Sequence, residues 1–198
     1  SVSKNAADTV KRVTLELGGK SPNLVFADCD LEQRVKEAVL ECFSNSGQSC
    51  DAPTRLLVEK SCYEEVIKIA RKAAENQMVD DPYKPGNHIG PLFDKIQFIR
   101  VQNMIKFGIE EGAKILIGGL GKPEGFERGW YVKPTIFYDV NNQMKVAREE
   151  IFGPVLVIIP FEGEDDAIRI ANETPYGLAS YLQTGNSERA ERVASQLR

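Results

Sequence analysis

Short apolar runs alternate along the chain with longer stretches whose apolar residues follow helical spacing. We expect strands in six stretches, among which 155–162 is apolar enough to be covered on both faces: 22–27, 55–60, 113–119, 129–140, 155–162 and 179–184. Helices are expected between them, over 30–45, 61–77, 94–111, 163–173 and 187–198. This alternation predicts an α/β fold in three layers, with a largely parallel sheet and helices on both faces.

The stretch before the first of these strands carries a carboxylate. Val13, Leu15 and Leu17 alternate with Thr14 and Glu16, as in a strand, and Gly18–Gly19 follow directly. Two glycines permit a sharp turn and a close approach of backbone. A carboxylate that faces a crevice there acts as a general base if it is partly desolvated. The alternative is a solvated glutamate on an edge strand.

A cysteine follows the first long helix on a polar loop. The sequence FSNSGQSC runs from Phe43 to Cys50, and a glycine at Gly47 allows the helix to end near Asn45 to Gly47. Cys42 has the apolar spacing of a buried structural cysteine, and Cys50 does not. A thiol on a polar loop is open to solvent, to substrate and to hydrogen-bond donors that stabilise a thiolate. The alternative is a free cysteine in a connecting loop.

A third stretch, EEIFGPV, leads into the most hydrophobic strand. It spans Glu149 to Val155, and its Gly153–Pro154 pair predicts a turn that holds Phe152 at the rim of the sheet. Ligands of open α/β sheets gather at the ends of such elements. The alternative is a plain loop with a hydrophobic anchor.

Composition narrows the class of protein further. The 198 residues are 42% hydrophobic and 27% charged, and the net charge of −4 gives no basic surface for nucleic acid. The sequence also contains no apolar run long enough to span a membrane. The cysteines, which form no C-x-x-C pair, are Cys29, Cys42, Cys50 and Cys62, and the single histidine is His88. We therefore expect no metal site, reduced thiols and a cytoplasmic location.

In this order, VTLELGGKSPNLVF, FSNSGQSC, EEIFGPVL and NETPYGLASYL closely resemble the aldehyde dehydrogenase superfamily over essentially the whole chain. The resemblance implies that Cys50 is the nucleophile, which forms a thiohemiacetal and then a thioester, and that its backbone N–H supplies half of an oxyanion hole. It implies that Glu16 is the general base for thioester hydrolysis. It also implies that Glu150 binds the nicotinamide ribose of NAD or NADP, and that Phe152 positions the nicotinamide ring.

Parts of the family pattern are absent from the chain, which begins at Ser1 without a methionine. The other oxyanion donor and the glycine-containing turn for the cofactor phosphates lie upstream in the family, and a strand used in oligomerisation lies downstream. We expect residues 1–19 to be a hinge or terminal strand of a missing cofactor-binding domain, and 20–198 to be the catalytic domain. Without its partner strands, the stretch from Val13 to Leu17 is expected to leave Glu16 displaced, and the fragment alone is expected to be inactive.

The resemblance implies a small-molecule aldehyde, of unspecified identity, as substrate and a homodimer or homotetramer for the whole enzyme. Two other classes of protein are alternatives to an aldehyde dehydrogenase. A non-catalytic module with this fold predicts an unreactive Cys50, and the intact Cys50 and Glu16 argue against that class. The other class is a thiol-redox or metal protein. Against it, this chain has no resolving cysteine at C-x-x-C spacing and only one histidine.

Overall fold

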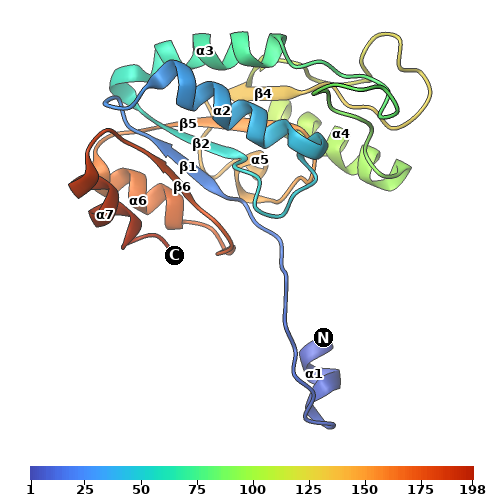
Figure 1. Cartoon of the computed structure of the whole chain (residues 1–198), viewed down its shortest axis with the longest axis horizontal. Helices are drawn as coiled ribbons and strands as arrows, with labels where there is room; N and C mark the ends of the chain where they lie inside the picture. Colours follow the sequence, from blue (N-terminus) through green and yellow to red (C-terminus); the bar gives the residue numbers. More distant parts are fainter.

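A six-stranded sheet runs through the body of the protein in the order β3–β4–β5–β2–β1–β6 (Figure 1). The computed structural model describes all residues, 1–198. The strands are β1 (Pro22–Val25), β2 (Arg55–Glu59), β3 (Lys114–Ile117), β4 (Thr135–Tyr138), β5 (Val155–Phe161) and β6 (Tyr181–Gln183). All neighbouring strands are parallel except β3 and β4, which are antiparallel. All six predicted strands are therefore present, in a largely parallel sheet.

Helices cover both faces of this sheet. On one face lie α2 (Leu31–Phe43) and α3 (Tyr63–Glu75), and on the other lie α4 (Lys95–Glu110), α5 (Lys145–Arg148), α6 (Glu164–Asn172) and α7 (Ser187–Ala194). Short 3₁₀ segments follow α2 and precede α3, at Ser44–Gly47 and Lys60–Cys62. The predicted three-layer α/β fold is confirmed.

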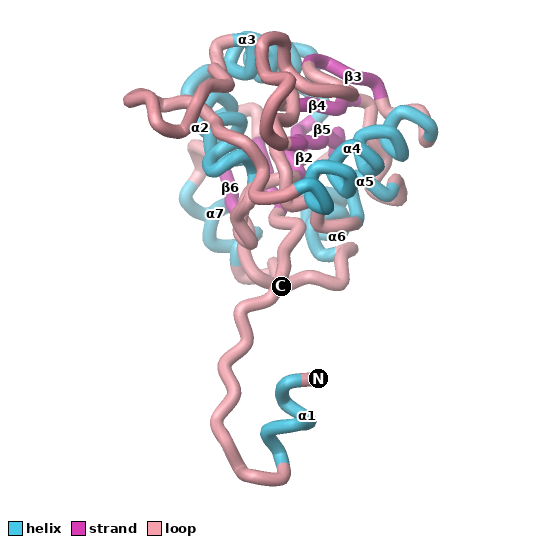
Figure 2. Tube along the Cα trace, turned by 90° about the vertical axis from the view of Figure 1, so that its right-hand side faces the viewer, coloured by secondary structure: helices cyan, strands magenta, loops and turns pink.

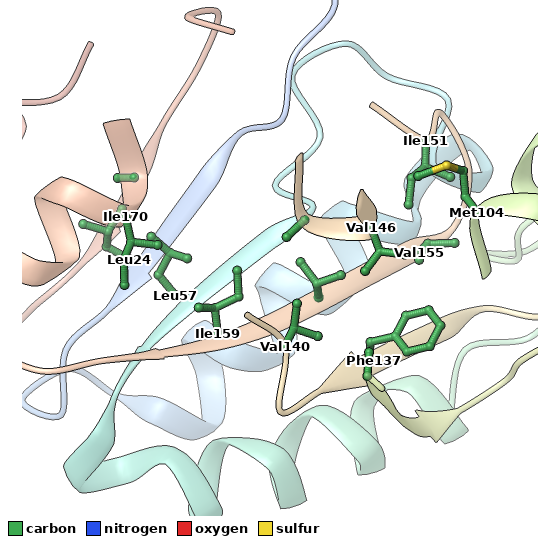
Figure 3. Close-up of a cluster of buried hydrophobic side chains, with 14 of the residues drawn as sticks. Leu24, Leu57, Met104, Phe137, Val140, Val146, Ile151, Val155, Ile159 and Ile170 are labelled. Carbon is green, nitrogen blue, oxygen red and sulfur yellow. The ribbon is translucent and has the colours of Figure 1, made fainter. Parts of the chain in front are cut away.

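Each face has its own hydrophobic core. The larger cluster joins β1, β2, β4 and β5 to helices α4 to α7, and Figure 3 shows its members, among them Leu57, Phe137, Val155 and Ile159. The second cluster lies between the sheet and the pair α2 and α3. Strand β5 contributes to both, because its successive side chains point to opposite faces. This explains why its sequence is a continuous apolar run.

Helix starts follow the polar signals in the sequence. The carboxylate of Asp30 accepts a hydrogen bond from the Gln33 N–H at the start of α2, and Asp94 accepts one from the Gln97 N–H at the start of α4. Sequence periodicity gave no signal for α1 (Val2–Ala7) or for α5, which has only four residues. No helix of the protein combines the length and apolar character needed to cross a membrane.

The amino-terminal segment lies apart from the sheet. Helix α1 is set off from the body by an extended stretch (Figures 1 and 2), and residues 11–21 contain no strand. The alternation of Val13, Leu15 and Leu17 therefore forms no strand in this chain, as expected for a stretch that lacks its partner strands. The physical reason is that Leu15 and Leu17 stay 51% and 62% exposed, so no neighbouring strand or core rewards the alternation.

A buried arginine ties the sheet to the segments around it. Arg55, the first residue of β2, is fully buried and donates hydrogen bonds to the carbonyls of Lys20, Ile170 and Ala171 and to the side-chain oxygen of Asn142. Burial lowers the pKa of its guanidinium to about 10, so it remains charged at neutral pH. The C-terminal carbonyls of α6 are a favourable place for a cation, because the helix dipole is negative there.

Replacing Arg55 by methionine is expected to destabilise the fold strongly. Arg55→Met leaves four buried acceptors without their donor, and we expect a loss of about 3–5 kcal/mol in the free energy of unfolding. Urea denaturation followed by circular dichroism measures the loss. Arg34→Met is the control, since Arg34 pairs only with Glu37 on the surface and should cost less than about 1 kcal/mol. Equal losses for the two variants would contradict the role of Arg55.

Candidate active site

The three stretches predicted to carry site residues meet at the amino-terminal ends of the strands. They lie directly before β1, β2 and β5, which are adjacent and parallel, so their amino ends point the same way. Arg55 of β2 pairs with Val157 of β5, and Cys50 and Phe152 each lie five residues before these partners. The register of the sheet therefore brings the Cys50 loop and the Phe152 loop side by side.

Glycines let these loops touch backbone to backbone. A Cβ on Gly19 would collide with the carbonyl oxygen of Cys50, and one on Gly47 would collide with the carbonyl of Gly153. A Cβ on Gly18 would likewise run into the carboxylate of Glu150. The absence of a side chain at these positions is thus what allows the three loops to pack together.

A left-handed turn carries the chain from α2 to Cys50. Helix α2 ends at Phe43, and Asn45, Ser46 and Gly47 follow with φ values of 50°, 58° and 70°. The Ser46 hydroxyl donates to the carbonyl oxygen of Gly90 at 2.8 Å, which anchors the turn to the loop before α4. The predicted helix end is confirmed, but two residues other than glycine share the positive φ.

Cys50 differs from the other cysteines in its surroundings. Its side chain is half-buried, and its backbone N–H makes no hydrogen bond within the protein. Burial raises the pKa of the Cys42 thiol to about 12 and that of the Cys62 thiol to about 11, which suppresses their thiolates. Cys29, also half-buried, has its pKa raised by burial and lies beyond the opposite, carboxyl end of β1. Cys50 is the thiol at the meeting point of the loops.

Glu150 is held by the loops on both sides of it. One oxygen of its carboxylate accepts a hydrogen bond from the Gly19 N–H at 3.3 Å, and its own N–H donates to the Tyr176 hydroxyl oxygen at 3.3 Å. Tyr176 belongs to the NETPYGLASYL stretch, in which no site residue is predicted from the sequence. Phe152, two residues further on, is half-buried and has a φ of 57°, which is uncommon for an aromatic residue.

Lys20 has surroundings that its sequence did not reveal. Only 1% of the residue is exposed, and its Nζ has no hydrogen-bond partner. Burial lowers the pKa of this ammonium to about 7, against the opposing effects of Cys42 and Glu150. An uncharged amine is cheaper to bury than an ammonium, so Lys20 is tolerated beneath the Gly18–Gly19 turn.

Glu16 is the predicted residue that the structure does not draw into the cluster. Its side chain is exposed and makes no hydrogen bond or ion pair. Gly18 and Gly19 contact Glu150 and Cys50, so this segment reaches the site, whereas the Glu16 carboxylate does not. His88, the single histidine, is half-buried with Nε2 2.9 Å from the carbonyl oxygen of Asp81. No group of three or more metal-binding side chains is close enough to hold an ion.

Fold and site together define an α/β protein with an accessible thiol at the amino edge of a parallel sheet, beside a carboxylate and an aromatic residue. The chain belongs to the aldehyde dehydrogenase family, whose model matches residues 1–198.

Similar proteins agree with this assignment. The chain is 51% identical over 197 residues to 3-succinoylsemialdehyde-pyridine dehydrogenase of a Pseudomonas species, covering 100% of the chain and 41% of that relative. The crystal structure of an aldehyde dehydrogenase from Bartonella henselae matches with 50% identity and a TM-score of 0.97, again over 100% and 41%. Aldehyde dehydrogenase C from Pseudomonas syringae, in complex with NAD⁺ and octanal, matches with 47% identity and a TM-score of 0.96, with the same coverage. The chain thus spans about 41% of the length of these relatives.

A side chain at Gly47 is expected to break the contact between two of the loops. Gly47→Ala places a Cβ on the Gly153 carbonyl and also strains a φ of +70°, so we expect a loss of roughly 3 kcal/mol in the free energy of unfolding. Gly125→Ala is the matched control, because Gly125 has a φ of +82° with no atom within 4 Å of the added Cβ, and should cost about 1 kcal/mol. Urea denaturation of both variants measures the difference. Similar losses would mean that backbone strain alone matters at Gly47.

Proposed function

We propose that the chain is the thiol-bearing catalytic part of an NAD(P)-dependent aldehyde dehydrogenase, which oxidises an aldehyde to a carboxylate. The observation that carries the proposal is the meeting of the Cys50, Glu150 and Gly18–Gly19 segments at the amino ends of three adjacent parallel strands. Membership of the family and the aldehyde and NAD⁺ bound by the Pseudomonas syringae relative support it.

Cys50 is the nucleophile in this mechanism. Its sulfur adds to the aldehyde carbonyl carbon and forms a thiohemiacetal, whose oxygen takes up negative charge as the bond forms. The Cys50 N–H has no partner within the protein and is available to donate to that oxygen. Departure of hydride from the former carbonyl carbon then leaves a thioester on Cys50.

Glu16 completes the cycle as the general base. It takes a proton from the water that attacks the thioester, and the collapse of the tetrahedral intermediate releases the carboxylic acid and the Cys50 thiol. In this chain Glu16 is exposed, two residues before Gly18. Gly18 lies against Glu150 and Gly19 against Cys50, so in the proposed enzyme the change that brings Glu16 to the thioester takes place in the backbone ahead of Gly18.

Glu150 and Phe152 have the chemistry to hold the nicotinamide end of NAD(P). The second oxygen of the Glu150 carboxylate accepts no hydrogen bond, so it is available to a ribose hydroxyl. The half-buried ring of Phe152, next along the same loop, offers an apolar surface to a flat heterocycle. NAD(P), when bound, accepts the hydride. Glu150 and Phe152 bind and orient it against Cys50.

The division of the chain follows from the same proposal. We assign residues 1–19 to the hinge or terminal strand of a cofactor-binding domain and 20–198 to the catalytic domain. The exposed Leu15 and Leu17, which line a shallow apolar depression with Tyr176 and Leu178, are the surface such a domain would cover. The complete enzyme is assigned to the cytoplasm as a homodimer or homotetramer, and the four unpaired thiols are compatible with a reducing compartment.

The complete protein that contains this chain is expected to reduce NAD⁺ or NADP⁺ in the presence of an aldehyde, and the activity is expected to depend on Cys50. Cys50→Ala should lower kcat/KM by at least about 1,000-fold, because the covalent pathway is lost. Cys29→Ala is the control, since Cys29 lies at the opposite edge of the sheet and should leave kcat/KM within about 2-fold. Absorbance of the reduced cofactor over a panel of aliphatic and aromatic aldehydes measures both. An unreactive Cys50 with no turnover would favour a binding module instead.

The isolated chain is expected to give no turnover under the same conditions. It holds the thiol, but it spans only about 41% of the length of its relatives, and Glu16 is exposed to solvent. Mixing residues 1–198 with NAD⁺ and aldehydes should therefore produce no reduced cofactor, while an alkylating reagent still modifies Cys50. Formation of reduced cofactor by this chain alone would contradict the prediction.

A further inference from the structure

Side chains of helix α4 donate hydrogen bonds to the backbone from Glu150 to Phe152. Gln97 of α4 donates from its side-chain Nε2 to the carbonyl oxygens of Ile151 at 2.9 Å and of Phe152 at 2.6 Å. Arg100, one turn further along the helix, donates to the carbonyl oxygen of Glu150 at 2.6 Å. Three successive carbonyl groups of the loop are therefore fixed by side chains of α4.

Gln97 is itself fixed before it reaches the loop. It is 7% exposed, and its backbone N–H is bound by the capping carboxylate of Asp94 at 2.7 Å. Both hydrogens of its side-chain amide are used, one for each carbonyl, so the orientation of the amide is determined. Val101, on the next turn of α4, belongs to the larger core cluster and lies against Gly153. The donors thus stand on a rigid base.

The loop that these donors hold is strained. Phe152 has a φ of 57°, a conformation that a bulky L-residue reaches only at an energetic cost and keeps only where its surroundings enforce it. The two carbonyls that bracket the Phe152 φ angle, those of Ile151 and Phe152, are the two that Gln97 binds. Removal of these donors lets the backbone relax toward negative φ, which swings the ring of Phe152 away from its present direction.

We propose that Gln97 is a positioning residue that sets the ring of Phe152 against the nicotinamide. This inference rests on the proposed function, in which Phe152 contacts that ring, and Gln97 acts only through Phe152. Its loss therefore impairs the step that needs the cofactor and spares chemistry that needs Cys50 alone. A thiol that forms a hydrolysable thioester also cleaves activated esters without any cofactor, and this reaction separates the two effects.

The test compares Gln97→Met with Gln102→Met in the complete protein. Gln102 lies on the same helix, its Nε2 has no partner, and its Oε1 accepts only the Gly121 N–H, so it controls for loss of a glutamine from α4. For Gln97→Met we expect kcat/KM for NAD⁺ to fall roughly 10- to 100-fold, as for a misplaced reacting group. Cleavage of p-nitrophenyl acetate without cofactor should stay within about 2-fold for both variants.

A double-mutant cycle with Phe152→Ala tests the route of the effect. If Gln97 acts through the Phe152 ring, then Gln97→Met should have little further effect on kcat/KM once the ring is gone. Multiplying effects, an equal fall in ester cleavage, or an unchanged kcat/KM for Gln97→Met would each overturn the inference.

Hydrogen exchange separates this inference from the proposed function. Gln97→Met should speed exchange of the backbone amides of residues 151–153 and 155 by about 10-fold or more, and Gln102→Met should not. If the unaltered protein oxidises no aldehyde, the proposed function fails and the kinetic role of Gln97 fails with it, whereas the exchange rates still decide whether Gln97 holds the loop. If the protein is active and exchange is unchanged, the inference about Gln97 alone is wrong.

Discussion

The guanidinium of Arg55 is the contact through which the candidate site and the sheet depend on each other. It is an unpaired cation at zero exposure, and it is tolerated there because carbonyl oxygens from Lys20 and from the end of α6 surround it. Its hydrogen bond to the Lys20 carbonyl fixes the residue directly after Gly18–Gly19, and its own strand begins five residues after Cys50. A single buried side chain therefore sets the distance between the loop that carries the thiol and the loop that carries the proposed base.

The position of the site departs from the usual rule for open α/β sheets, in which ligands bind at the carboxyl ends of the strands. Here the loops before β1, β2 and β5 form it, at the amino ends. In the usual arrangement the amino ends of helices supply the donors, whereas at this edge α2 arrives with its carboxyl end. In the proposed mechanism, donors for a developing oxyanion come from loop backbone, and the unpartnered N–H of Cys50 is available for this role. Close packing of three loops requires glycine at each contact, which accounts for Gly18, Gly19 and Gly47.

Sequence patterns predicted the six strands and the long helices because the apolar residues of each recur with the period of a strand or a helix. Packing in the sheet or against it buries these residues. The stretch from Val13 to Leu17 has the alternation of a strand but no neighbouring strand in this chain, so it stays extended and exposed, as expected. The ordered motifs pointed to Cys50, Glu150 and Phe152, and the register of the sheet together with the glycine contacts brings their loops together. Gln97, Arg100 and Tyr176 could not be found this way, since each acts on backbone about 25 to 55 residues away and leaves no periodic trace. The positive φ of Phe152 is equally invisible, because only the enclosing contacts enforce it.

The residues proposed for thioester formation, Cys50 and Phe152, are held in place more firmly in this chain than Glu16, the residue proposed for thioester hydrolysis. The Cys50 segment is held by the turn before it and by strand β2 after it. The Phe152 segment is held by hydrogen bonds from α4 and by strand β5 after it. Glu16 is fixed from one side only, where Gly18 and Gly19 meet Glu150 and Cys50. The Glu150 carboxylate binds the Gly19 N–H and, in the proposed enzyme, the cofactor ribose as well. In the proposed enzyme, the carboxylate that binds the cofactor is therefore the same group that holds the Gly18–Gly19 segment next to the proposed base.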